Sequence, residues 1–329
     1  MGKPLAHELS QQAVNALERF GGVQKAADFL EMSRTTLQSR LKVAARYGIK
    51  PKPAPAPVIK EIPPKKPIVR VQAGTDHEAR YRVLAIGDAH DSPSIPKDRF
   101  RWMGRHAQAM GADYVVQIGD FFTLDSLNTH IPNDTLMGKQ KNAYSLDLES
   151  AEQAMAEFDK GLSGHRPKMH VTMGNHERRA WFYEERNPET QNLLVGPLTC
   201  IVEQYRWTWS EYGEFFFLGG VGFVHAALNR LGKTYGGKNS EQTIANDAVF
   251  DMAIGHSHVG RSWRAPKIGP SQFVNVVNLG CALPQNHIED YAMHATTGWT
   301  WGVFDLLIGG GHIQSASFVG MPELERRYS

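Results

Sequence analysis

Oxygen and imidazole donors follow several apolar runs of the sequence, and their types suit a metal site. The series opens with "GDAH" and closes with "GHSH". A mixed set of carboxylate, amide and imidazole donors suits ions such as Mn²⁺, Fe or Zn²⁺, and glycines before the donors let the backbone approach closely. The donors are, in chain order, Asp88, His90, Asp120, Asn175, His176, His225, His256 and His258.

The number of donors matches a site for two ions. Two metals roughly 3.5–4 Å apart can clamp the attacking and leaving oxygens of a phosphoryl transfer, and they need one bridging carboxylate and about three further ligands each. On a strand, residues i and i+2 point to the same face, so His256 and His258 could reach adjacent ions. The set therefore has the number of donors that such a two-metal site needs.

The elements that position these donors alternate between strand and helix from about residue 80 onward. Runs such as "RVLAIGD", "DYVVQIGD", "MHVTMGNHE", "VGFVHA", "FDMAIGHSH" and "FVNVVNLG" indicate buried strands. "DRFRWMGRHAQAM" and "DLESAEQAMAEFDKGL" indicate helices between them. This order predicts an α/β body with ligands at the carboxyl ends of its strands.

The first part of the chain has a different character. Residues 8–47 show helical spacing in three segments, and Ser33 is a natural N-cap for the third. Residues 50–71 are rich in proline and lysine, which predicts an extended tether on the order of 60 Å long at roughly 3.1 Å per residue.

Charge divides the chain in the same way. Residues 1–72 hold 13 Lys and Arg against 5 Asp and Glu, a net charge of +8; since the whole chain carries +2, the remainder carries −6. A basic segment is attracted to polyanions such as nucleic acid.

Composition limits the class of protein further. The 329 residues, 41% of them hydrophobic, can bury a large core. The two cysteines, Cys200 and Cys281, lack the spacing of a zinc cluster and are predicted to be buried free thiols. With no signal-like segment and no apolar stretch near 18 residues, we expect a soluble cytoplasmic protein without membrane contacts.

The donor series in "GDAH", "GD", "GNHE", "FVHA" and "GHSH" resembles the calcineurin-like metallophosphoesterase superfamily over about residues 80–320. The chain as a whole resembles a bacterial or phage-encoded phosphoesterase. The resemblance implies a layered α-β-β-α sandwich over residues 76–329, after a small all-α domain (1–49) and a Pro/Lys-rich linker (50–75). It also implies two divalent ions, with Mn²⁺ expected and Fe, Zn²⁺ or Ni²⁺ as alternatives.

The resemblance implies a role for each donor. Asp88, His90, Asp120 and His258 would hold one ion, and Asp120, Asn175, His225 and His256 the other, with Asp120 as the bridge. A metal-bound hydroxide would be the nucleophile, and His176 would act at the leaving group. We therefore expect the catalytic residues to include Asp88, Asn175 and His176.

Departures from the family pattern restrict the substrate. Protein phosphatases of the superfamily carry Gly-Asp-x-x-Asp-Arg-Gly, whereas this chain has "GDFFTLDS", without the arginine. His225 precedes alanine where glycine is common, so its assignment has the weakest support. Arg178 and Arg179 could contact phosphates of a longer substrate, or they could be solvated charges at a helix start.

A long segment follows the strand that precedes Asp120. Residues 121–145 exceed a usual connection and could form a substrate wall. Phe121 and Phe122 could stack on bases, although core packing of both rings is the favoured interpretation.

Within the basic first part of the chain, about residues 13–47 resemble the helix-turn-helix of Fis-like bacterial DNA-binding domains. The third helix of that motif enters the major groove. The resemblance therefore implies Arg34, Thr35, Gln38 and Arg40 as DNA contacts. Glu31 departs from it, since this turn often has glycine with a positive φ. A plain helical oligomerisation unit is the alternative.

The favoured function is a two-metal phosphodiesterase or nuclease acting on DNA. One alternative is a phosphomonoesterase or small-nucleotide phosphodiesterase whose N-terminal domain only localises or dimerises the protein. A homodimer is therefore a possible state of the chain. Another is a DNA-binding regulator with an inactive body. Pocket shape decides between these, and the sequence does not fix it.

Overall fold

The computed structural model describes residues 3–20, 22–50, 72–73, 79–131, 134–289, 292 and 298–329. By its internal contacts the chain divides into two units, Met1–Val69 and Arg70–Ser329. Most of the expected proline- and lysine-rich linker lies outside the described residues. Two residues counted with that linker, Gln72 and Ala73, form a short strand that pairs within the second unit.

The first unit consists of three helices, α1 (Lys3–Phe20), α2 (Val23–Phe29) and α3 (Arg34–Arg46). The side chain of Ser33 caps α3 by accepting the N–H of Thr36 at 3.1 Å, as predicted. Glu31, in the turn before it, adopts φ 50°. A glutamate therefore takes the left-handed conformation for which this turn often uses glycine.

The core of the first unit is small. Leu37 of α3 is fully buried against alanines of the two preceding helices. Those alanines are Ala13, Ala16, Ala26 and Ala27. A unit of this size depends on few large side chains for its stability.

The second unit, the body, contains two six-stranded sheets. In spatial order the first sheet holds β1 (Gln72–Ala73), β6 (Phe216–Leu218), β7 (Val221–Phe223), β8 (Met252–Ile254), β10 (Phe273–Leu279) and β9 (Gly260–Pro266). The second sheet holds β12 (His312–Gly320), β11 (Gly302–Gly309), β2 (Arg80–Ile86), β3 (Tyr114–Gln117), β4 (Lys168–Thr172) and β5 (Trp207–Ser210).

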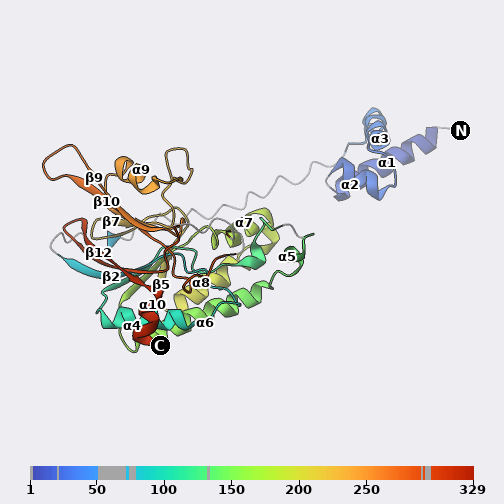
Figure 1. The fold of residues 1–329 in the computed structure, drawn as a ribbon. Coiled ribbons are helices and arrows are strands. Elements are labelled where there is room, and N and C mark those ends of the chain that lie inside the picture. Colours follow the sequence, from blue (N-terminus) through green and yellow to red (C-terminus); the bar gives the residue numbers. More distant parts are fainter. Residues whose placement is uncertain are drawn as a thin grey trace. The chain divides into compact units, whose positions relative to one another are not determined.

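Helices cover the outer faces of both sheets (Figure 1). Helices α4, α6, α8 and α10 pack on the second sheet, and α9 packs on the first. The helical segments are α4 (Asp98–Ala109), η1 (Asp125–Leu127), α5 (Leu136–Lys139), α6 (Tyr144–Leu162), α7 (Arg178–Arg186), η2 (Pro188–Thr190), α8 (Val195–Gln204), α9 (Ser240–Asp247) and α10 (Met321–Tyr328). The predicted α-β-β-α sandwich with a helical N-terminal unit is confirmed.

Strand β2 shows how the sequence builds these layers. Val83 and Ala85 face the core between the two sheets, whereas Leu84 and Ile86 face the core under the helices. A strand buried on both faces needs apolar residues at every position, so its sequence reads as a continuous run. Parallel pairing of β2, β3 and β4, and of β7 and β8, brings the loops after these strands to one edge.

The predictions for cysteines and membranes have different outcomes. Cys281 is buried and free as predicted, but Cys200 is exposed on α8, so its predicted burial was wrong. Within the described ranges, no helix combines the length and apolarity needed to cross a membrane.

Replacing Leu37 by Ala should unfold the first unit selectively. Removing a buried leucine side chain costs about 2–5 kcal/mol, and this small core offers little to compensate for the loss. We expect hydrogen exchange of the α1–α3 amides to accelerate strongly while the body amides keep their protection. Leu37→Met, which conserves volume, is the control. Unchanged exchange in Leu37→Ala would contradict the role of this core.

Candidate metal centre

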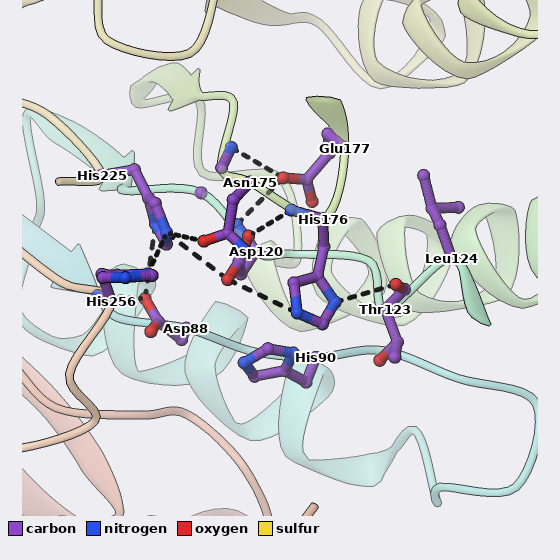
Figure 2. Close-up of polar contacts among 12 residues, drawn as sticks. Asp88, His90, Asp120, Thr123, Leu124, Asn175, His176, Glu177, His225 and His256 are labelled. Atoms are coloured by element: carbon purple, nitrogen blue, oxygen red, sulfur yellow. Dashed lines mark hydrogen bonds and ion pairs between the residues drawn. The ribbon is translucent and has the colours of Figure 1, made fainter. Parts of the chain in front are cut away.

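The predicted donors lie together in one cluster, and Figure 2 shows all of them except His258, which is not labelled there. They lie in the loops that follow five strands, β2, β3 and β4 of one sheet and β7 and β8 of the other. Because both sheets end here, residues from distant parts of the sequence meet in one cluster.

One group of donors contains Asp88, His90 and His258, and all three residues are buried. Nε2 of His258 lies 3.0 Å from Oδ2 of Asp88 and 2.9 Å from Nε2 of His90. A carboxylate oxygen and two imidazole nitrogens thus face one point.

A second group contains Asp120, His225 and His256. Nε2 of His225 lies 3.4 Å from Oδ2 of Asp120 and 3.3 Å from Nδ1 of His256. Oδ1 of Asn175 lies 2.9 Å from the same nitrogen. His225, whose assignment had the weakest support in the sequence, therefore lies at the middle of this group.

The hydrogen bonds of these residues fit a divalent ion. Oδ2 of Asp88 is buried and accepts no hydrogen bond from the described residues. Nδ1 of His225 donates to the carbonyl of Ile118 at 2.9 Å, which leaves the lone pair of Nε2 facing the cluster. This tautomer is the one that a metal-ligating histidine needs.

Burial and mutual repulsion shape the charges of the cluster. The pKa of His90 lies well below its ordinary value because of burial and the nearby His176 and His258. Burial opposes ionisation of Asp120, yet its pKa is lowered because His225, His176 and His90 surround it.

His225 shows the reverse balance. Burial acts to lower the pKa of its imidazole, but the carboxylates of Asp120 and Asp88 outweigh burial and raise it. The cluster thus places electron-pair donors around anionic oxygens, which is an environment that favours a cation.

His176 lies beside the cluster in a fixed orientation. Its backbone N–H donates to Oδ1 of Asp120 at 2.8 Å, and its Nδ1 donates to the carbonyl of Thr123 at 2.9 Å. Its Nε2 lies 3.9 Å from Oδ2 of Asp120 and accepts from a guanidinium nitrogen of Arg179 at 3.3 Å. Nδ1 is therefore held by the backbone, and Nε2 is the ring nitrogen that faces Asp120 and Arg179.

The spacing of the two closing histidines, His256 and His258, had suggested that both lie on a strand. In the structure neither of them does. Strand β8 ends at Ile254, and His256 and His258 follow it with φ values of 70° and 59°. They reach different groups because the backbone turns sharply. Two further donors, His90 and Asp120, also have left-handed φ values, of 43° and 48°. Such residues cost about 1–3 kcal/mol each and cluster at functional sites.

Sequence reasoning missed Glu177, the last residue of "GNHE". Its buried carboxylate accepts the backbone N–H groups of Asp120 at 3.0 Å, Phe122 at 2.8 Å and Gly174 at 2.7 Å. Burial and the Asp120 carboxylate raise the pKa of Glu177 to about 7, against the effect of these donors. Glu177 thus ties the loop after β3 to the loop after β4.

Arg99 was missed as well. This arginine of α4 is buried, and it donates to the carbonyls of Ala89 and Ala282, each at 3.1 Å. Ala89 lies between Asp88 and His90, so Arg99 holds the backbone of the first donor loop. The only signal in the sequence was an arginine in an otherwise apolar helical stripe.

The other predicted contacts differ in their environments. Phe121 and Phe122 are buried in the core under the helices, so the favoured interpretation, core packing, is the one found. Arg178 is exposed. Arg179 lies 3.6 Å from a carboxylate oxygen of Asp125 and donates to the carbonyl of Thr123 at 2.8 Å.

Helix α3 presents only part of the predicted DNA contacts on one face. Arg34, Thr35 and Gln38 are exposed and cluster on one side of the helix. Arg40 is half-buried and lies about 200° around the helix axis from Gln38. The structure therefore separates Arg40 from the other three.

Comparison with known proteins identifies the class. Residues 81–278 match the calcineurin-like phosphoesterase model, which is more than half of the chain, so the chain belongs to that family. It is a metal-dependent phosphoesterase. Residues 14–42 match the model of the Fis family of bacterial regulatory proteins. Both resemblances are confirmed.

Similar solved structures are distant in sequence. A predicted phosphoesterase from Streptococcus pneumoniae is 11% identical, with 74% of this chain and 91% of that chain covered and a TM-score of 0.33. A single mutant of Vps29 from Entamoeba histolytica is 15% identical, with 72% and 98% covered and a TM-score of 0.34. No curated protein matches the chain. The family assignment therefore rests on the family model.

Replacing Asp120 by Asn should remove bound metal. The change keeps the size of the side chain but removes the anionic charge that lies close to His90 of the first group and to His225 and His256 of the second. We expect the wild-type protein to retain about two ions per chain after dialysis and the variant to retain few. Elemental analysis measures this directly. Asp125→Asn is the matched control, because Asp125 pairs with Arg179 outside the cluster; equal metal loss in both variants would contradict the assignment.

Proposed function

We propose that the chain is a two-metal phosphodiesterase that acts on DNA. Asp88, His90, Asp120 and His258 hold one ion, and Asp120, Asn175, His225 and His256 hold the other. The observation that carries this proposal is the clustering of the donors. Asp88, His90 and His258 form one group, and Asp120 groups with His90 and His176 on one side and with His225 and His256 on the other. Bound divalent ions would polarise the phosphate and lower the pKa of water toward 7.

The chain's own residues then orient the substrate and handle a proton. Because Nδ1 of His176 is committed to the carbonyl of Thr123, Nε2 is the atom that faces the leaving oxygen. Arg179 donates toward this nitrogen and is anchored by Asp125. Once Nε2 is protonated, His176 can stabilise developing charge or transfer that proton to the leaving oxygen, and Arg179 lies beside it.

Two features support DNA as the substrate. The first unit matches the Fis-type helix-turn-helix and belongs to the basic part of the chain, which suits binding to a polyanion. In the body, the cleft beside the donors measures about 1350 Å³, more than the roughly 300–1,000 Å³ of a typical small-ligand site. A long substrate fits such a cleft better than a small phosphomonoester does.

A substrate panel tests the proposal. The full chain with Mn²⁺ is given a generic monoester, a generic diester, and single- and double-stranded DNA. We expect turnover of the diester and of DNA, and His176→Ala should lower both by about 10²–10⁴-fold while its metal content stays near that of the wild type. If a small nucleotide turned over rapidly and DNA stayed intact, the DNA assignment would fail. Loss of metal in His176→Ala would show that its role is misassigned.

Binding through α3 gives a separate prediction. Arg34→Ala should weaken binding to duplex DNA by about 1–3 kcal/mol, since Arg34 lies on the exposed face with Thr35 and Gln38. Arg40→Ala should weaken it less, because Arg40 lies on another side of the helix. Fluorescence anisotropy at two salt concentrations measures both effects. An equal or larger loss in Arg40→Ala would require a different docking face.

A further inference from the structure

The cleft beside the metal centre continues along helix α7. Asp120, Asn175 and His176 line one part of it, and Phe182, Tyr183 and Arg186 of α7 line another. The reacting phosphate therefore needs to occupy only a small share of the cleft. The remainder is available to parts of a substrate that do not react.

Helix α7 lines this cleft with alternating cationic and aromatic side chains. Arg178, Phe182 and Arg186 recur every four residues, so they share one stripe of the helix. The guanidinium carbon of Arg178 lies 4.3 Å from the ring centroid of Phe182 and 4.9 Å from that of Tyr212. The guanidinium carbon of Arg186 lies 6.0 Å from the Phe182 centroid. These contacts hold the arginines and rings in a preformed row.

The row is exposed and its charge is not neutralised. The side chains of Phe182 and Tyr183 are 40% and 42% exposed. Among the described residues, Arg178 and Arg186 have no ion-pair partner, in contrast to Arg179 with Asp125. Exposed rings beside guanidinium groups without an ion-pair partner suit an anionic ligand that contains rings.

We propose that this face of α7 binds single-stranded DNA next to the cleavage site. Arg178 and Arg186 contact phosphates, and Phe182 and Tyr183 stack on unpaired bases. The inference rests on the proposed function, because the bound strand continues to the metal centre. Bases of an intact duplex are covered by their neighbours and cannot stack on these rings. Phe121 and Phe122 cannot supply the stacking, since both are buried.

The test compares two substrates in the full chain with Mn²⁺. One is bis(p-nitrophenyl) phosphate, a diester too small to span the cleft, and the other is a labelled oligothymidylate. Phe182→Ala and Arg186→Ala should each lower the ratio of oligothymidylate to small-diester kcat/KM about tenfold, the loss expected for one stacked base or one phosphate contact. Phe182→Tyr, which keeps a ring, should restore the ratio. Arg166→Ala is the matched arginine control, because Arg166 is exposed just before β4, at the end of that strand opposite the centre.

The outcomes separate this inference from the proposed function. An unchanged ratio in both alanine variants, or an equal preference of the wild type for a blunt duplex, would overturn the single-strand site while small-diester turnover still supports a phosphodiesterase. Absence of diester turnover by the metal-loaded wild type would overturn the proposed function instead. In that case, binding of the labelled oligothymidylate is measured by fluorescence anisotropy in the presence of a chelator. Excess unlabelled duplex DNA is added to occupy the first unit. This measurement still decides whether the α7 variants bind the single strand more weakly than the wild type.

Discussion

The carboxylate of Asp120 is the contact on which the arrangement of the site depends. One oxygen accepts the backbone N–H of His176, and the other lies 3.4 Å from Nε2 of His225. These partners follow β4 of one sheet and β7 of the other. A single buried side chain thus joins the ends of both sheets. Its contacts form only if the surrounding strands end close to the carboxylate of Asp120.

Such a cluster can form only because the surrounding backbone is held from outside. Several donors adopt left-handed φ values, which residues other than glycine rarely do. Glu177 and Arg99 counteract this strain by tying donor loops to each other and to helix α4. Gly174 and Gly255 contribute differently: a β-carbon at either position would collide with the carboxylate of Asp120 or Asp88. The site is therefore preorganised by residues that bear no ligand atoms.

How much of this could be predicted follows from the kind of signal each feature leaves in the sequence. Buried parallel strands leave long apolar runs, and a ligand leaves a polar residue where such a run ends, so β2, β3 and the donors were predictable. Edge strands such as β9, where most residues are exposed, leave no such run. The left-handed turn at His256 replaced the strand geometry that its spacing suggested, because tertiary contacts override local preference there. The four-residue spacing of Arg178, Phe182 and Arg186 is visible in the sequence, but the sequence does not show that these residues line the cleft beside the donors.

The charge distribution of the chain bears on how the body could bind the proposed DNA substrate. Residues 73–329 carry a net charge of −6, which repels a polyanion at long range. For the proposed DNA substrate, attraction would therefore come from the first part of the chain, with its net charge of +8, or from short-range contacts in the cleft. Long-range attraction falls off within about 10 Å at moderate salt, so it can concentrate DNA near the protein but cannot position a phosphate. In the proposed complex, positioning would fall to Arg178 and Arg186, because planar guanidinium groups suit phosphate binding at contact distance. If DNA is the substrate, as proposed, the basic first part of the chain would raise the local concentration of DNA near the body, and contacts in the cleft would fix which phosphate reaches the metal centre.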